Sequence, residues 1–183
     1  MRGNRIALDL PPWLAELNRA PRRFAGLPEA MAFAVDAARR NIADGGGPFG
    51  ALVVDDGLRL VAVGVNRVVP LHGSILHAEM LALLLAQRRL GSHDLASLGD
   101  YSLVTSCAPC AMCLGAIPFA GVRRVLCGAR GEDAEAIGFD EGDKPERWAD
   151  KLRARGIAVE EDLGRDGAVA VLNAYRAGSG VIY

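Results

Sequence analysis

The chain has 183 residues, of which 51% are hydrophobic, and this is enough to form one compact domain with a substantial apolar core. Its formal net charge of −1 argues against a dedicated nucleic-acid binder, because phosphate contacts normally require an excess of Lys and Arg. Residues 131–166 carry twelve acidic and six basic side chains, so this region would repel a phosphate backbone. No apolar stretch has the length of a signal peptide or a membrane span, so we expect no membrane association.

The four cysteines crowd into one short window of the sequence, at positions 107, 110, 113 and 127. Such clustering suits a metal or reactive site better than a disulfide framework in a domain of this size. We therefore expect a reducing, cytoplasmic location.

The first half of the chain predicts helices followed by an antiparallel hairpin. Apolar residues at helical spacing indicate one short and one longer amphipathic helix, and the run Gly45–Pro48 ends the second. The turn signal Asp55-Asp56-Gly57 separates two strand candidates and favours antiparallel pairing. The elements expected in this half are helices at 12–19 and 27–44, strands at 50–55 and 58–66, and a buried helix at 77–90.

Strands and helices alternate in the second half, which predicts parallel pairing through right-handed crossovers. The complete pattern predicts an α/β fold, a three-layer α/β/α sandwich around a mixed five-stranded sheet. The elements expected in this half are strands at 101–106, 123–127 and 157–161, and helices at 109–120, 145–155 and 166–177.

Two short motifs carry the chemistry, His77-Ala78-Glu79 and Pro109-Cys110-Ala111-Met112-Cys113. Proline is tolerated at the first helical position, so we expect a helix from Pro109 with Cys110 and Cys113 on one face. The positive end of that helix favours the thiolates that zinc requires. His77 opens the preceding helix, and neighbouring helix starts gather at the carboxyl edge of a parallel sheet. We therefore predict one Zn²⁺ ion bound by His77, Cys110 and Cys113.

Three protein ligands would leave a fourth coordination position for water, whose pKa zinc lowers to roughly 7. Glu79, two residues after His77, could take the water proton and pass it to a ring nitrogen of a bound heterocycle. A fourth thiolate from Cys107 would close the site and abolish catalysis. A structural zinc site would not require Glu79, so the combined pattern favours catalysis and matches the signature of zinc deaminases.

At these motifs the chain resembles the cytidine deaminase superfamily, of the CMP/dCMP deaminase zinc-binding type. The segments Gly47–Ala51 and Ser106–Ile117, together with Asn66, are most similar to its bacterial guanine deaminase branch. The resemblance implies a zinc-dependent deaminase domain over residues 27–183, with an N-terminal extension over residues 1–26 packed on the core.

The resemblance also implies roles for further residues. Glu141 would bring a second acidic side chain into the pocket and help to protonate or release the departing amino group. Asn66 would hydrogen-bond the base, and main-chain groups around Ala51 and Ala78 would hold the water or the ring. The far C-terminus would close over the substrate, and the candidate lid residues are Phe139, Ile182 and Tyr183.

The implied reaction is the hydrolysis of guanine to xanthine and ammonia, or the deamination of a closely related amino-substituted heterocycle. The expected partner is a small nucleobase rather than a nucleic acid, and the expected assembly is a homodimer with a candidate contact at 117–122. Three alternatives stay open. The acidic 131–166 region disfavours a tRNA adenosine deaminase, the segment around Glu141 disfavours a cytosine or cytidine deaminase, and Glu79 disfavours a non-catalytic zinc-stabilised binding module. Ala108 departs from the branch, which usually has Glu there, and this affects substrate detail rather than hydrolysis.

Overall fold

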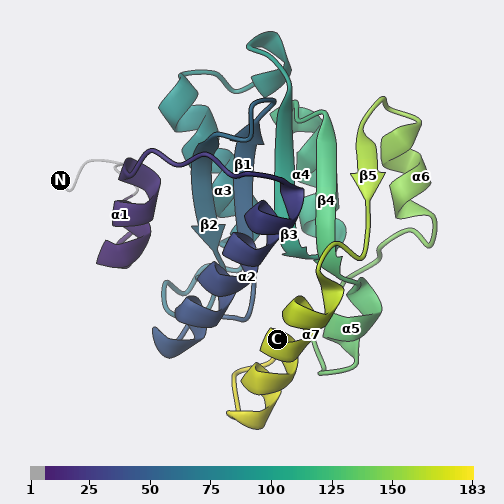
Figure 1. Cartoon of the computed structure of the whole chain (residues 1–183). Coiled ribbons are helices and arrows are strands. Elements are labelled where there is room, and N and C mark those ends of the chain that lie inside the picture. Colours follow the sequence, from purple (N-terminus) through teal and green to yellow (C-terminus); the bar gives the residue numbers. More distant parts are fainter. Residues whose placement is uncertain (1–6) are drawn as a thin grey trace, which may run out of the picture.

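The computed structural model describes residues 7–183 and shows a five-stranded sheet between two layers of helices (Figure 1). The strand order is β2-β1-β3-β4-β5. The sheet is mixed, with antiparallel pairing in its first half and parallel pairing in its second half. β1 pairs antiparallel with β2 and β3, whereas β3 pairs parallel with β4, and β4 with β5. The strand bounds are Gly50–Asp55 for β1, Leu60–Val65 for β2, Tyr101–Cys107 for β3, Arg124–Ala129 for β4 and Ala158–Glu160 for β5.

Helices cover both faces of the sheet, which confirms the predicted three-layer α/β/α fold. α2 and α7 lie on one face, and α3 and α4 lie on the other (Figure 1). Within the described part of the chain, no helix is both long enough and apolar enough to cross a bilayer. The helix bounds are Pro12–Arg19 for α1, Leu27–Ala43 for α2, Ala78–Leu90 for α3, Ala111–Ala120 for α4, Gly131–Glu135 for α5, Trp148–Arg153 for α6 and Arg165–Ala177 for α7.

Successive strand residues divide between the two apolar cores, as the pleat of a β-strand requires. On β1, Leu52 belongs to the cluster that includes α2 and α7, whereas its neighbour Val53 belongs to the cluster that includes α4 and α6. On β4, Leu126 and Cys127 divide in the same way. The predicted place of Cys127 in the core is confirmed, since its side chain is buried.

Two glycines allow helices to approach the β1–β2 hairpin closely. A Cβ atom on Gly64 would lie 2.2 Å from the carbonyl oxygen of Ala78, at the start of α3. A Cβ atom on Gly50 would lie 2.3 Å from the carbonyl oxygen of Ala34 in α2. Atoms cannot approach this closely, so each helix can take its place only because a side chain is missing there.

Helix α1 protects the outer edge of the sheet beside β2. Oδ1 of Asn18 accepts a hydrogen bond of 2.8 Å from the Val63 N–H, and Nδ2 of Asn18 donates one of 3.0 Å to the Val63 carbonyl. These bonds satisfy main-chain groups that an edge strand would otherwise expose. Trp13 of the same helix is buried, and its indole N–H donates to the Asp44 carboxylate. Of the extension expected over residues 1–26, the first six lie outside the described residues.

The expected hairpin is confirmed, although its second strand is shorter than the predicted strand at 58–66. The Leu58 N–H donates to the Asp55 carbonyl at 3.0 Å, which closes the turn, and Leu58 itself has φ of +58°. This backbone conformation is incompatible with a strand, so β2 begins at Leu60 rather than at 58.

The helix expected from Pro109 begins two residues later, at Ala111, so Cys110 of the metal motif lies just before the helix. Cys110 has an extended backbone, with φ of −66° and ψ of 173°, and is the N-cap of α4. The sequence pattern also fails to predict two short elements, because they span too few residues to show a periodicity. These are the 3₁₀ helix η1, at Leu95–Ser97, and α5.

Candidate metal centre and active site

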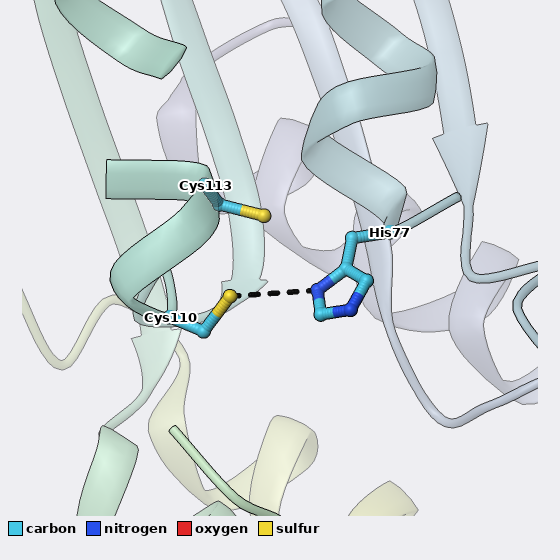
Figure 2. Close-up of side chains that lie close together, drawn as sticks. All are labelled: His77, Cys110 and Cys113. Atoms are coloured by element: carbon cyan, nitrogen blue, oxygen red, sulfur yellow. Dashed lines mark hydrogen bonds between the residues drawn. The ribbon is translucent and has the colours of Figure 1, made fainter. Parts of the chain in front are cut away.

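The starts of α3 and α4 bring together the three predicted zinc ligands (Figure 2). His77 is the N-cap of α3, Cys110 is the N-cap of α4, and Cys113 lies one turn into α4. One ligand atom from each of the three side chains lies within 4.8 Å of the others, and Cys110 Sγ is 3.5 Å from His77 Nδ1. Figure 2 shows the three side chains pointing toward one another from the two helices.

The donor set fits zinc in an open site. Zinc binds Cys sulfur at about 2.3 Å and His nitrogen at about 2.0 Å, and three protein ligands are typical of catalytic sites. Separations of a few ångströms between donors are compatible with one shared ion. Cys107 does not belong to this group within the described residues; its thiol donates to the Arg130 carbonyl at 3.3 Å, and burial raises its pKa.

Burial and mutual hydrogen bonding shift the pKa values of the three donors. Interaction with Cys113, with a further hydrogen bond to His77, lowers the pKa of Cys110 to about 4. The same interaction with Cys110, together with burial, raises the pKa of Cys113. Burial alone would lower the pKa of His77, but Cys110 and the nearby Glu79 outweigh it, and the pKa is raised. Metal binding at this site must therefore displace protons.

A cavity of about 400 Å³ opens beside the three donors. This volume lies in the lower part of the usual range for small-molecule pockets, roughly 300–1,000 Å³. Most of the residues predicted for the site lie on its wall, namely Asn66, His77, Glu79, Cys110, Phe139, Glu141 and Tyr183. The sequence assigned no role to six further lining residues, Phe49, Ser74, Ala111, Met112, Asp140 and Gly142.

Two carboxyl groups on the cavity wall have raised proton affinities. Glu79 lies in the first turn of α3, and its Oε2 accepts a hydrogen bond of 3.6 Å from the Cys113 thiol. Burial raises the pKa of Glu79. Burial likewise raises the pKa of Glu141 to about 7, although the ammonium group of Lys144 opposes the shift. Glu141 can therefore hold a proton near neutral pH, and burial shifts Glu79 in the same direction, as suits general acids and bases.

Asn66 presents a free amide donor to the cavity. Its Oδ1 accepts hydrogen bonds from the Tyr183 hydroxyl at 2.7 Å and from the Val68 N–H at 3.3 Å. Its Nδ2 donates to no group of residues 7–183. The buried Asn41 fixes the adjoining main chain, because its Nδ2 donates to the carbonyls of Asn66 and Gly47 at 2.7 and 2.8 Å.

Aromatic rings form one wall of the cavity. The Phe139 ring lies edge-on to Phe49 and Tyr183, with centroids 4.9 and 5.4 Å away, and it stacks on Tyr175 at 5.9 Å. Such a wall suits a flat heterocycle. Of the lid candidates, Phe139 and Tyr183 line the cavity, whereas Ile182 packs against the apolar core beneath α2 and α7.

Ala51 and Ala78 are fully buried and do not line the cavity. Residues next to them in the sequence, Phe49, His77 and Glu79, do so instead. Ala108 lines the cavity at the position where the sequence departs from the related branch.

Residues 27–129, more than half of the chain, match the family model of the cytidine and deoxycytidylate deaminase zinc-binding region. The chain belongs to this family of zinc-dependent deaminases. The metal that this family binds is zinc, and His77, Cys110 and Cys113 provide donor atoms that suit it.

The deaminase is similar along nearly its whole length to two solved structures. The guanine deaminase from Nitrosomonas europaea is 47% identical, with a TM-score of 0.94 and coverage of 97% of this chain and 99% of that one. A structure solved in complex with 2,6-diaminopurine is 49% identical, with a TM-score of 0.93 and coverage of 97% and 95%.

Among curated relatives, the guanine deaminase of Bacillus subtilis is 44% identical over 96 residues. This match covers 52% of the deaminase and 59% of the relative, less than two-thirds of its length. Cytosine deaminases and tRNA deaminases also match, at identities from 31% to 40%.

Proposed function

We propose that this deaminase hydrolyses guanine to xanthine and ammonia, with one zinc ion per chain. The observation that carries this proposal is the convergence of three zinc donors and two buried carboxyl groups beside one cavity of about 400 Å³. The near-full-length similarity to a guanine deaminase and to a structure with a bound diaminopurine supports the same substrate class.

We assign the zinc ligands as His77, Cys110 and Cys113. Zinc with three protein ligands supplies an acidic water, with a pKa of roughly 7, as the nucleophile at neutral pH. The starts of the two helices hold the three side chains at fixed places, so the ion joins two segments that are distant in sequence.

Glu79 is the general base and acid of the proposed reaction. Its carboxylate takes a proton from the attacking water and passes it to the ring nitrogen beside the attacked carbon. This transfer avoids negative charge on the ring as the amidine carbon becomes tetrahedral. The raised pKa of Glu79 allows the buried carboxyl group to hold the proton between the two steps.

Glu141 acts on the departing group. It reaches the cavity from the segment that follows α5, on a different part of the wall from Glu79. In the proposed reaction it delivers a proton to the amino group, and the carbon–nitrogen bond breaks to release ammonia. The proton that the hydroxyl group loses as the carbonyl forms replaces the one given up by Glu141. Its pKa of about 7 suits this donation at neutral pH.

The base is held by polar and aromatic contacts. Nδ2 of Asn66 donates to an acceptor atom of the ring, and the side chains of Phe139 and Tyr183 line the space around it. Tyr183 closes one side of the cavity, and its main-chain oxygen accepts a hydrogen bond of 3.5 Å from the Asp140 N–H.

Ammonia release tests the proposal and its rivals. The purified protein would be assayed with guanine, adenine, cytosine, their nucleosides and a tRNA anticodon stem-loop, beside a Glu79→Gln variant. We expect turnover of guanine that is lost in the variant while its zinc content is unchanged. Activity on the stem-loop alone would identify a tRNA adenosine deaminase, and activity on cytosine alone a cytosine deaminase.

We further propose a cytoplasmic homodimer, in which residues 27–183 form the deaminase domain and residues 1–26 an extension of it. Ile117 and Val122 are buried within the protomer, so a dimer contact in the 117–122 segment must use Phe119, which is 82% exposed. Light scattering on the wild type and on Phe119→Ser would test this contact. A monomeric wild type contradicts it, as does a variant that stays dimeric.

A further inference from the structure

Lys144 is one of only two lysines in the chain, and it occupies an unusual position. Its side chain is 11% exposed, although lysine is rarely buried without a partner. Its ammonium group lies 3.4 Å from Oε2 of Glu141, whose side chain is 8% exposed, and 4.8 Å from the centroid of the Trp148 ring. The proposed mechanism gives this lysine no task.

Glu141 stands between two cavities. It lines the active-site cavity and also a second, polar cavity of about 380 Å³, and Lys144 lines only the second. Lys144 therefore contacts the carboxylate from the second cavity. Oε2 is engaged by the ammonium group, whereas Oε1 accepts no hydrogen bond from any residue in 7–183.

Gly131, at the start of α5, leaves the room that this pair needs. A Cβ atom there would lie 3.1 Å from Lys144 Nζ and 3.3 Å from Glu141 Oε2, which is tighter than ordinary packing. The carboxylate, the ammonium group and the glycine thus form a fitted arrangement rather than a chance surface contact.

We propose that Lys144 is the positioning residue for Glu141. By holding Oε2, the ammonium group directs Oε1 toward the departing amino group of the substrate. A charge-assisted hydrogen bond between the buried Glu141 and the largely buried Lys144 restricts the carboxylate to one orientation, and small misplacements of a reacting group are costly for rate. This inference rests on the proposed function, because Glu141 acts only if the deamination occurs.

A purely structural alternative is that Lys144 fastens its loop to Trp148 on α6. A double-mutant cycle separates the two roles, because a residue that acts through Glu141 loses its effect when Glu141 is already disabled. The variants are Lys144→Met, Glu141→Gln and the combination of both. The matched control is Lys151→Met, which removes the other, exposed lysine.

In the wild-type background, we expect Lys144→Met to lower kcat by roughly tenfold to hundredfold, a loss in keeping with a misplaced acid–base group. KM and zinc content should stay close to wild type, and Lys151→Met should leave kcat unchanged. In the Glu141→Gln background, Lys144→Met should change kcat by no more than about twofold. An equal loss of kcat in both backgrounds, or an unchanged kcat in the wild-type background, overturns the proposal.

A second readout does not depend on activity. Crystal structures of the wild type and Lys144→Met should show the Glu141 carboxylate in different orientations, and an unchanged carboxylate overturns the positioning role. If the wild type released no ammonia from guanine, the proposed function would fail while this readout still decided the inference. Should Lys144→Met not fold, Lys144→Gln keeps a polar side chain that is too short to reach Oε2, and an unchanged kcat in that variant overturns the proposal.

Discussion

The Tyr183 hydroxyl donates a hydrogen bond of 2.7 Å to Oδ1 of Asn66, and these residues are 117 positions apart. The bond fixes which end of the amide faces the cavity, so Nδ2 is left to meet the base. Burial raises the pKa of Tyr183, which keeps the phenol protonated and able to donate at neutral pH.

Replacing Tyr183 with Phe should therefore weaken substrate binding more than catalysis. We expect KM for guanine to rise about fivefold, corresponding to a hydrogen bond worth about 1 kcal/mol, with kcat little changed. Steady-state kinetics would measure both. Tyr101→Phe is the matched control, since Tyr101 lies at the opposite end of β3 from the cavity; an equal KM in the two variants would contradict the role of Tyr183.

Replacing Glu141 with Ala should slow the reaction without releasing the metal. We expect kcat to fall about hundredfold, because proton donation by a positioned side chain contributes about 10²–10⁴. Zinc content, measured by atomic absorption, should match the wild type. Glu146→Ala removes an exposed carboxylate from the same region and should leave kcat unchanged; a Glu141 variant with near-normal turnover would remove this residue from the mechanism.

The pH dependence of kcat should show the titration of the Glu141 carboxyl group. Its pKa is raised from 4.5 to about 7, and the carboxyl group must carry a proton in order to donate one. The protonated fraction is therefore complete well below pH 7 and is lost as the pH rises through about 7, so kcat should fall on the alkaline side. A pH series with Glu141→Gln should lack this alkaline decline, and a decline of the same midpoint in that variant would assign it to another group.

Two Gly→Ala substitutions should have opposite effects on stability. Ala at Gly64 would place Cβ against the main chain of α3, so the free energy of unfolding should fall by about 1 to 3 kcal/mol. Ala at Gly115, in α4, meets no atom within 4 Å and should raise it by up to about 1 kcal/mol through better helix propensity. Urea denaturation followed by circular dichroism would measure both. Because α3 carries His77 and Glu79, Gly64→Ala should also retain less zinc, and full stability in that variant would contradict the close approach.

Much of the fold could be predicted because apolar periodicity records which faces are buried. The continuous apolar runs of β1 and β2, which are buried on both faces, are visible in the sequence, as is the turn at 55–57. The predicted ends of the helices and strands were less accurate than their order along the chain. The extended backbone at Cys110 depends on how α4 docks beside α3, and no local propensity of Pro109 could show it.

The site was predictable to the extent that its chemistry depends on residue types at fixed spacing. His77, Cys110 and Cys113 were found in this way, whereas Glu141 came only from a family resemblance. The partnership of Lys144 with Glu141 had no sequence signal, because a lysine three residues from a glutamate in a loop is ordinarily solvated. Its burial against Trp148 arises from the tertiary arrangement.

Because Trp148 lies beneath the Lys144 ammonium group, it can serve as an intrinsic fluorescent probe. Indole fluorescence responds to a cation held over the ring, so the emission of this tryptophan should change whenever the ammonium group moves. The chain has one other tryptophan, Trp13, which is buried near α2 and is distant from Trp148 in the sequence. A Trp13→Phe form would let spectroscopists follow events behind the catalytic pocket without attaching a dye.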